Sequence, residues 1–287
     1  MPADTVLDSI EPVPGAPKPD ALLRAEGVCR RFGGLKAVDV ARLDVQRGCI
    51  TALIGPNGAG KSTFFNVLSG FDRADAGTWA FDGRAVNGMR AHQIARLGMV
   101  RTFQLTKALA KLSVLDNMKL GAPNQVGERL LSSLLRSRWR AQEAAIEARA
   151  LELLERFQLI GHRDAYAGTL SGGQRKLLEM ARAMMADPAL LLLDEPMAGV
   201  NPALVQSLLD HIREIAVAGT TVLFVEHDMD VVTGISDWVV CMGLGRVIAE
   251  GRPAHVTSDP AVIDAYLGSS HDDPGYLAAH PEEPPHA

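Results

Sequence analysis

Cysteine is scarce in this chain of 287 residues, and the few cysteines present are too far apart in the sequence to form a recognisable motif. Cys29, Cys49 and Cys241 form no Cys-x-x-Cys pair. This spacing argues against a zinc site and against a disulfide framework, and it is typical of a protein in a reducing compartment. Because Cys49 and Cys241 fall in predicted strands, we expect both to be small buried apolar residues.

Long apolar runs are also missing. No uninterrupted stretch approaches the roughly 18 residues that a membrane-spanning helix needs. The first residues lack the basic and then apolar pattern of a secretory signal. We therefore expect a protein that crosses no membrane itself, although it can lie against a protein that does.

An excess of positive charge is the third absence. The formal net charge is −5 and the isoelectric point is about 5.9. Domains that bind nucleic acid are usually basic, because they neutralise phosphates with lysine and arginine. We therefore expect no nucleic-acid partner.

Both ends of the chain have few apolar residues. Residues 1–20 contain Pro2, Pro12, Pro14, Pro17 and Pro19, and residues 269–287 are likewise rich in proline and acidic side chains. Such segments cannot bury enough apolar surface to offset the entropy of ordering. The composition predicts two disordered tails around a folded domain at residues 21–268.

The most informative stretch is Gly55-Pro56-Asn57-Gly58-Ala59-Gly60-Lys61-Ser62-Thr63, which fits the phosphate-binding pattern G-x-x-x-x-G-K-[ST]. A short apolar strand precedes it and a helix follows, as the motif requires. Glycines let the backbone N–H groups approach a polyphosphate, and the helix N-terminus favours negative charge. We expect Lys61 to reach the β- and γ-phosphates, Ser62 to ligate Mg²⁺, and Thr63 to add a phosphate contact. The predicted nucleotide-binding residues are Asn57, Gly58, Ala59, Gly60, Lys61, Ser62 and Thr63.

Two further strands deliver polar residues at their ends. Leu190–Leu193 leads into Asp194 and Glu195, and Val222–Val225 leads into Glu226 and His227. The C-terminal ends of parallel strands are where ligands bind in open α/β sheets. We predict that Asp194 holds the Mg²⁺ shell, that Glu195 orients or deprotonates the attacking water, and that His227 senses the γ-phosphate.

The pattern of predicted elements indicates an α/β fold. Short strands dominate residues 22–81, with hairpin turns predicted at Arg47-Gly48 and Asp82-Gly83. Residues 114–159 have helical spacing and predict a helical subdomain inserted at about residues 107–185. After Leu170, helices alternate with continuous apolar strands, which predicts a covered and mostly parallel sheet. Together with the phosphate loop, this predicts a P-loop NTPase (RecA-like) core with an antiparallel β subdomain and an inserted α-helical subdomain.

The predicted helical insertion contains an apolar stripe at Leu130, Leu131, Leu134 and Leu135. Such a stripe normally packs inside its own subdomain. It can also lie on a membrane surface or on a partner helix, and the sequence leaves this choice open.

Residues Leu170–Gln174 read Leu-Ser-Gly-Gly-Gln just before a predicted helix. Ser171 is a plausible cap, and the two glycines expose backbone N–H groups at the helix start, which makes a second anion site. Two separate sites for one γ-phosphate are odd within a single chain. They make sense if the second site serves another subunit.

The set of motifs resembles the ATP-binding subunit of an ABC transporter over about residues 21–268. The order is Phe32, Gly55–Thr63, Gln104, Leu170–Gln174, Leu190–Glu195, Ala198–Asn201 and His227. More narrowly, Arg31–Leu35, Arg101–Gln104, Met197–Asn201 and Glu226–Met229 resemble the LivG-type ATPases of branched-chain amino acid importers.

This resemblance implies roles for further residues. Phe32 would stack on adenine, and Gln104 would approach Mg²⁺ and link the site to the membrane subunits. Ser171, Gly172 and Gly173, with Gln174 completing the motif, would contact the γ-phosphate of ATP held by the opposite subunit. Two positions depart from many relatives. Phe32 replaces their tyrosine, which keeps the ring and loses only the hydroxyl. Asn201 replaces their aspartate, which weakens the expectation of a charged contact there, although asparagine is common in the importer branch.

The resemblance also implies partners. A second ATPase subunit, sister or self, would pair head-to-tail with this one over two Mg-ATP molecules. Two integral membrane permeases would contact the surface near Gln104 to Asn117, on the cytoplasmic face of the membrane, and would receive solute from an extracytoplasmic binding protein. Alternatives remain: an importer ATPase for urea, short-chain amides or another solute such as lipid-linked cargo, or a soluble ABC ATPase of DNA repair, translation or iron–sulfur assembly.

Overall fold

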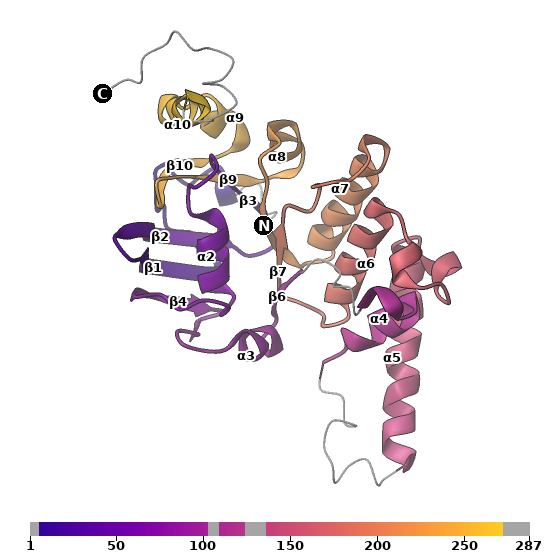
Figure 1. Cartoon of the computed structure of the whole chain (residues 1–287). Helices are drawn as coiled ribbons and strands as arrows, with labels where there is room; N and C mark the ends of the chain where they lie inside the picture. Colours follow the sequence, from indigo (N-terminus) through magenta and orange to yellow (C-terminus); the bar gives the residue numbers. More distant parts are fainter. Residues whose placement is uncertain (1–5, 103–108, 124–135, 272–287) are drawn as a thin grey trace.

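A computed structural model describes residues 6–102, 109–123 and 136–271 of the protein. Two sheets lie side by side, and most of the helices gather on the side of the larger sheet that faces away from the smaller sheet (Figure 1). Within the described part of the chain, no helix is long and apolar enough to cross a membrane.

The smaller sheet is antiparallel. Its four strands are β1 (Ala21–Phe32), β2 (Leu35–Gln46), β4 (Ala76–Phe81) and β5 (Arg84–Ala85), in the order β2-β1-β4-β5. Asp82-Gly83 joins β4 to β5 as predicted. The hairpin predicted at Arg47-Gly48 is wrong, because this turn leads from β2 into the other sheet, where the next strand pairs in parallel with two others.

The larger sheet contains the strands that carry the predicted site. Its six strands are β3 (Ile50–Ile54), β6 (Met99–Arg101), β7 (Leu190–Asp194), β8 (Thr221–Val225), β9 (Trp238–Gly243) and β10 (Arg246–Gly251). They lie in the order β10-β9-β3-β8-β7-β6, and every neighbouring pair is parallel except β10 with β9.

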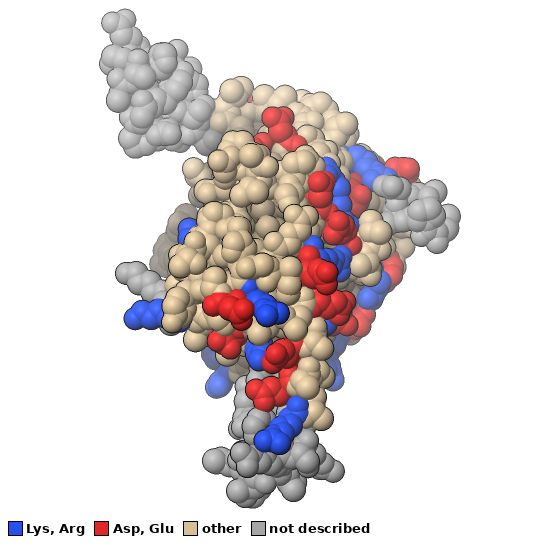
Figure 2. Space-filling view, turned by 90° about the vertical axis from the view of Figure 1, so that its right-hand side faces the viewer, with Lys and Arg blue, Asp and Glu red and all other residues tan. Residues whose placement is uncertain are grey.

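Helices flank both sheets. They are α2 (Lys61–Leu68), α3 (Ala91–Arg96), α4 (Val114–Leu120), α5 (Arg136–Arg156), α6 (Gly172–Met184), α7 (Pro202–Val217), α8 (Met229–Ile235), α9 (Pro253–Thr257) and α10 (Pro260–His271), with 3₁₀ turns at Leu109–Lys111, Ile160–His162 and Ala167–Thr169. On the side formed by α4–α7, basic and acidic side chains are interspersed (Figure 2). Several are paired, as in Lys119–Glu147 at 2.6 Å and Arg213–Asp210 at 2.7 Å.

The larger sheet is buried on both faces, which explains its continuous apolar strands. Successive side chains of a strand point to opposite faces. Leu191 and Leu193 accordingly pack with the α4–α8 side, whereas Leu190 and Leu192 pack with α2 and the smaller sheet. Each apolar side chain of β7 is therefore buried on one face of the sheet or the other, and the strand has no polar face.

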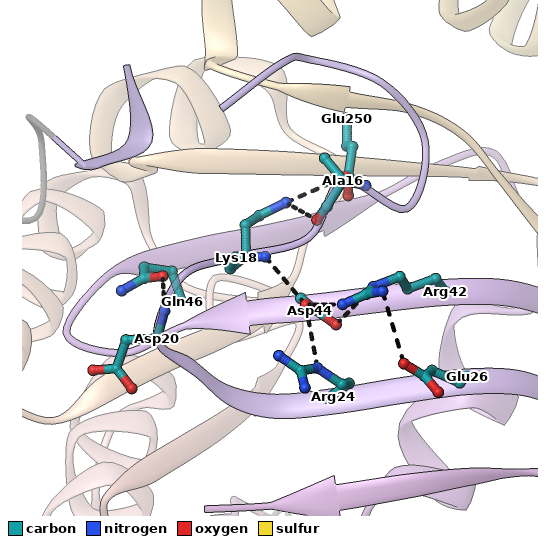
Figure 3. A network of polar contacts seen from close by, with 9 residues as sticks. All are labelled: Ala16, Lys18, Asp20, Arg24, Glu26, Arg42, Asp44, Gln46 and Glu250. Carbon is teal, nitrogen blue, oxygen red and sulfur yellow. Dashed lines mark hydrogen bonds and ion pairs between the residues drawn. The ribbon is translucent and has the colours of Figure 1, made fainter. Parts of the chain in front are cut away.

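The N-terminal segment differs from the expectation of a disordered tail at residues 1–20. Residues 6–20 lie against the two sheets (Figure 3), with Leu7 and Ala16 buried. The Lys18 ammonium lies 3.1 Å from Glu250 Oε1 on β10, and the Lys18 N–H donates to Asp44 on β2. The prolines at positions 12, 14, 17 and 19 exclude a helix or a central strand there, but they permit an irregular strap whose polar groups are satisfied by side chains.

Some predictions fall on residues outside those that the structure describes. These are Gln104, the stripe at Leu130–Leu135, and the C-terminal tail from residue 272 onward. Residues 269–271, expected in that tail, instead continue helix α10. The predicted helical insertion contains α4, α5 and α6 within its bounds.

Candidate functional site

Strand pairing brings the predicted site residues to one edge of the larger sheet. Leu53 of β3 and Asp194 of β7 both pair with Val225 of β8. The residues that follow these strands are the glycine loop, Glu195 and Glu226-His227, so all three segments leave the sheet at the same edge. The register of three parallel strands therefore builds the site from segments far apart in the sequence.

The loop at residues 55–63 has space for glycine alone at two positions. Gly55 has φ +144°, and a Cβ there would overlap the carbonyl oxygen of Met242 on β9. Gly60 has φ +95°, and a Cβ there would overlap the carbonyl oxygen of Ala37 on β2. The loop is thus wedged between the two sheets, and a side chain at either glycine would push it out of place.

Lys61 lies folded against the curve of this loop. Its ammonium donates to the carbonyl oxygens of Gly55 at 2.7 Å and Pro56 at 3.0 Å. Burial lowers the pKa of Lys61, and the negative charges of Glu195 and Asp194 oppose that shift. The carboxylates at the end of β7 are therefore close enough to act on this cation.

Helix α2 begins at Lys61, so the N–H groups of Lys61, Ser62 and Thr63 have no acceptor within the helix. They are the natural donors to an anion at this point. The Ala59 N–H differs, because it donates to the Pro56 carbonyl at 3.2 Å. Of the loop residues predicted to bind phosphate, Ala59 thus has its backbone donor committed to the loop itself.

Asp194 is held by an arginine that sequence reasoning gave no role. Arg101, at the end of β6, lies 2.6 Å from Asp194 Oδ2 and also donates to Asn66 Oδ1 on α2 at 2.7 Å. The Arg101 side chain is 8% exposed, whereas that of Asp194 is 30% exposed. The buried arginine fixes the orientation of a carboxylate that stays partly exposed.

Glu195 is the next residue, and its backbone is strained. Its φ is +46°, in the left-handed region that costs a residue with a side chain about 1–3 kcal/mol. Its N–H donates to the Val225 carbonyl at 3.0 Å, and its own carbonyl accepts from Lys176 Nζ at 3.4 Å. These bonds hold the unusual conformation, which leaves the carboxylate exposed to solvent.

Glu226 is a buried carboxylate between two predicted functional segments. Its Oε1 accepts from the Met197 N–H at 2.9 Å, and its Oε2 accepts from the His227 N–H at 3.3 Å. Burial raises the pKa of Glu226, and the two backbone donors oppose that shift. Its Oε2 also lies 3.7 Å from Nδ1 of the exposed His227 ring. One side chain thus ties the loop after Glu195 to His227.

Ser171 caps helix α6 as predicted. Its hydroxyl accepts from the Gln174 N–H at 3.3 Å, and the Gln174 carbonyl oxygen Oε1 accepts from the Ser171 N–H at 2.9 Å. Gln174 Nε2 lies 3.0 Å from His162 Nε2. In the described part of the chain, no hydrogen bond joins Ser171–Gln174 to the loop at 55–63. The Gln174 side chain therefore serves the cap of α6.

Phe32 stands apart at the end of β1. Its side chain is half exposed, and the Arg30 guanidinium lies over its ring at 4.6 Å. An exposed aromatic face of this kind can stack on a planar base. Its place at the rim of the smaller sheet fits the predicted adenine contact.

The residues present suit Mg²⁺. Ser62 and Asp194 offer a hydroxyl and a carboxylate, the oxygen ligands that Mg²⁺ takes, and it usually completes its shell with phosphates and water. Within the described ranges, no group of three or more His, Cys, Asp or Glu could hold a metal ion. The donor set therefore fits an ion brought in with a polyphosphate better than an all-protein metal site.

Comparison with known proteins agrees with this geometry. The sequence profile of the ABC transporter family matches residues 38–198, more than half of the chain. The chain belongs to the ABC transporter family. The predicted fold class, a P-loop NTPase of the α/β class, and the resemblance to this family are confirmed. A second profile, the branched-chain amino acid ATP-binding cassette transporter, matches residues 246–272.

Individual relatives cover nearly the whole cassette. The chain is 44% identical over 248 residues to the probable branched-chain amino acid transport ATP-binding protein LivG of Archaeoglobus fulgidus, covering 86% of this chain and 96% of the relative. It is 41% identical over 252 residues to the high-affinity protein LivG of Escherichia coli, covering 87% and 98%. The solved ADP conformation of MJ1267, an ATP-binding cassette of an ABC transporter, matches with a TM-score of 0.76 at 37% identity, covering 86% and 99%.

Sequence reasoning missed three residues of this ABC cassette that contact its predicted site: Arg101, Glu226 and Tyr266. Arg101 and Glu226 lie inside motifs that carry the family resemblance. Neither one belongs to a sequence pattern that would by itself indicate its role in the site. Tyr266 lies far along the chain on α10, and only the fold brings its hydroxyl to Gly55.

Proposed function

We propose that this cassette is the ATP-hydrolysing subunit of an ABC importer for branched-chain amino acids. Support for the solute comes from the names of the relatives and from the profile matched at residues 246–272. The solute itself never touches this chain in such a system. The identity of the solute is therefore proposed from the relatives, and the hydrolysis of ATP is proposed from the residues of the site.

The phosphate loop would hold the ATP polyphosphate. Lys61 would turn from the Gly55 and Pro56 carbonyls to the β- and γ-phosphates, and the free N–H groups at the start of α2 would bind the remaining oxygens. Ser62 and Asp194 would hold Mg²⁺, which neutralises the developing charge on the phosphates. Phe32 would stack on the adenine.

Glu195 is the proposed general base. It would take a proton from a water as the water oxygen bonds to the γ-phosphorus, while the bond to the β,γ-bridging oxygen breaks and ADP leaves with the electron pair. His227 would contact the γ-phosphate from the end of β8. The observation that carries this proposal is the strand register, which places Lys61, Asp194-Glu195 and His227 at one edge of the sheet.

The active unit is proposed to be a head-to-tail dimer. Among the described residues, Ser171–Gln174 makes no hydrogen bond to its own phosphate loop. The first N–H groups of α6 would serve an ATP held by a second ATPase subunit, either a sister chain or another copy. Each site would then need both subunits. The bounds of the ATPase domain, residues 21–268 with the helical insertion at 107–185, belong to the same proposal.

Two permeases would dock on the cytoplasmic side at a groove of about 400 Å³ between α3, β6, α4 and α6. Leu120, Arg96 and Arg182 are among its lining residues. Leu109, which lies in the stretch from Gln104 to Asn117 that the family resemblance assigns to coupling, also lines the groove. Its lining is apolar with several basic side chains and the acidic Glu179, which suits an amphipathic helix from a membrane subunit. That membrane subunit would in turn receive solute from an extracytoplasmic binding protein.

The first test is nucleotide binding and hydrolysis by the full chain. We expect Mg-ATP binding that Lys61→Ala abolishes, and hydrolysis that stops when Mg²⁺ is removed with a chelator. A matched control is Lys111→Ala, in a 3₁₀ turn away from the loop, which should leave binding unchanged. ATP affinity in Lys61→Ala equal to that of the wild type would contradict the placement of phosphate in this loop.

A further inference from the structure

Tyr266 connects the C-terminal helix to the start of the phosphate loop. Its hydroxyl accepts a hydrogen bond from the Gly55 N–H at 2.9 Å, across 211 positions of sequence. The tyrosine lies on α10, which packs against β10 and α9 at the end of the described chain. The loop is therefore held in part by a helix that follows every strand of the sheet.

Gly55 is constrained from several sides. Its carbonyl accepts from the Lys61 ammonium at 2.7 Å, and the Met242 carbonyl fills the space where a Cβ would lie. Tyr266 supplies the acceptor for its N–H. The orientation of this one residue thus determines both the entry of the loop and the position of the lysine that would meet phosphate.

The tyrosine itself is well held. Its ring is half-buried and packs against the apolar core on the helical side of the sheet. Val262, on the same helix, is buried in that core as well. Burial raises the pKa of Tyr266 to about 12, so the hydroxyl stays neutral throughout the physiological pH range. A fixed neutral hydroxyl is a stable acceptor for a backbone N–H.

We propose that Tyr266 is a positioning residue for nucleotide binding, which holds Gly55 in the conformation that receives the ATP phosphates. Helix α10 then sets the affinity of the phosphate loop, although it contributes no group to the phosphates. The inference rests on the proposed placement of phosphate in the loop at residues 55–63.

The test is Tyr266→Phe in the full chain, which removes one oxygen and keeps the ring. We expect the Kd for ATP, measured with a fluorescent analogue, to rise about five-fold, the equivalent of about 1 kcal/mol for one hydrogen bond. The KM for ATP should rise by a similar factor with kcat nearly unchanged, since ground state and transition state lose the same contact. Amide exchange of a peptide containing Gly55 should become faster.

The control is Tyr166→Phe, at an exposed tyrosine of the helical side, which should change neither affinity nor exchange. A lowered melting temperature with an unchanged Kd for ATP would overturn the proposal and make Tyr266 an anchor of α10 only. The Lys61→Ala variant distinguishes the proposed phosphate site from the proposed role of Tyr266. If it abolishes ATP binding while Tyr266→Phe has no effect on the Kd, the proposed function stands and this inference fails.

Discussion

The chemistry of this cassette depends on how single residues are oriented by their backbone. Glu195 is exposed, and two hydrogen bonds fix its left-handed backbone: its N–H donates to the Val225 carbonyl, and its carbonyl accepts from Lys176 Nζ. Lys61, by contrast, is positioned by two carbonyl oxygens of its own loop. Motifs predicted which residues to expect here. The strained backbone of Glu195 could not be predicted from the sequence, because it depends on the pairing of β7 with β8.

Replacing Glu195 with glutamine should separate ATP binding from hydrolysis. The amide keeps the size of the side chain but cannot accept the proton of the water, so we expect turnover about 10²–10⁴-fold slower. ATP binding should remain. Single-turnover hydrolysis and equilibrium binding measure the two effects, and Glu152→Gln, on the exposed side of α5, is the control. Near-normal turnover would remove Glu195 from this role.

Glu226 offers a second residue-scale test. Glu226→Gln keeps an acceptor for the Met197 N–H but replaces the other carboxylate oxygen, so the His227 N–H loses its partner. We expect a fall in kcat with a modest loss of stability, about 1 kcal/mol for one hydrogen bond. Glu226→Ala loses both acceptors and should cost more in each respect. Steady-state kinetics and urea unfolding of the two variants give the comparison, and an equal kcat in all three proteins would contradict it.

At the scale of elements, the order and type of strands and helices were predictable because apolar runs and glycine turns mark them. The continuous runs at β7 and β8 predicted a doubly covered sheet, and the cores on both faces confirm that reading. The strap at residues 6–20 was not predictable. Its anchors, Leu7, Ala16 and Lys18, are isolated residues among prolines, and their partners lie up to 234 positions away.

The strap should contribute measurably to stability. The Lys18 side chain is almost completely buried beside Glu250 and lies over the Trp238 ring at 4.4 Å. Removing one partner of a buried ion pair leaves an uncompensated charge, which costs about 3–5 kcal/mol. We therefore expect Lys18→Ala to lower the free energy of unfolding by about that amount in urea titrations.

The matched control is Arg149→Ala on α5, where the ion pair with Glu152 is exposed and should contribute less than about 1 kcal/mol. A double variant, Lys18→Met with Glu250→Gln, should recover part of the loss because no charge remains buried. If Lys18→Ala is as stable as the wild type, the strap does not hold the two sheets together.

At the scale of the whole molecule, the proposed function divides each ATP site between two subunits. The phosphate loop lies at the edge of the larger sheet, and Ser171–Gln174 serves as the start of α6. The five-residue motif is the sequence feature that suggests this division, because a second anion site makes sense if it serves a second subunit. The groove beside α3 and α6 was not predictable in shape, since it depends on how α6 packs against β6 and α4.

Ser171→Arg should act across the dimer. The long cation would block the space at the start of α6, so we expect hydrolysis to be lost while ATP binding to the isolated chain persists. Ser171→Ala controls for the helix cap, whose loss costs about 1 kcal/mol of stability. Loss of ATP binding by the Ser171→Arg monomer would instead place Ser171 in its own subunit's site.

The most direct test of the account is solute uptake by proteoliposomes that contain this chain with its membrane subunits and its binding protein. With Mg-ATP on the cassette side, we predict uptake of leucine, isoleucine and valine that depends on ATP and is lost with Glu195→Gln. ATP-driven uptake of urea or a short-chain amide without uptake of leucine would contradict the proposed solute. ATP hydrolysis that proceeds normally with no solute transported would contradict the central claim itself.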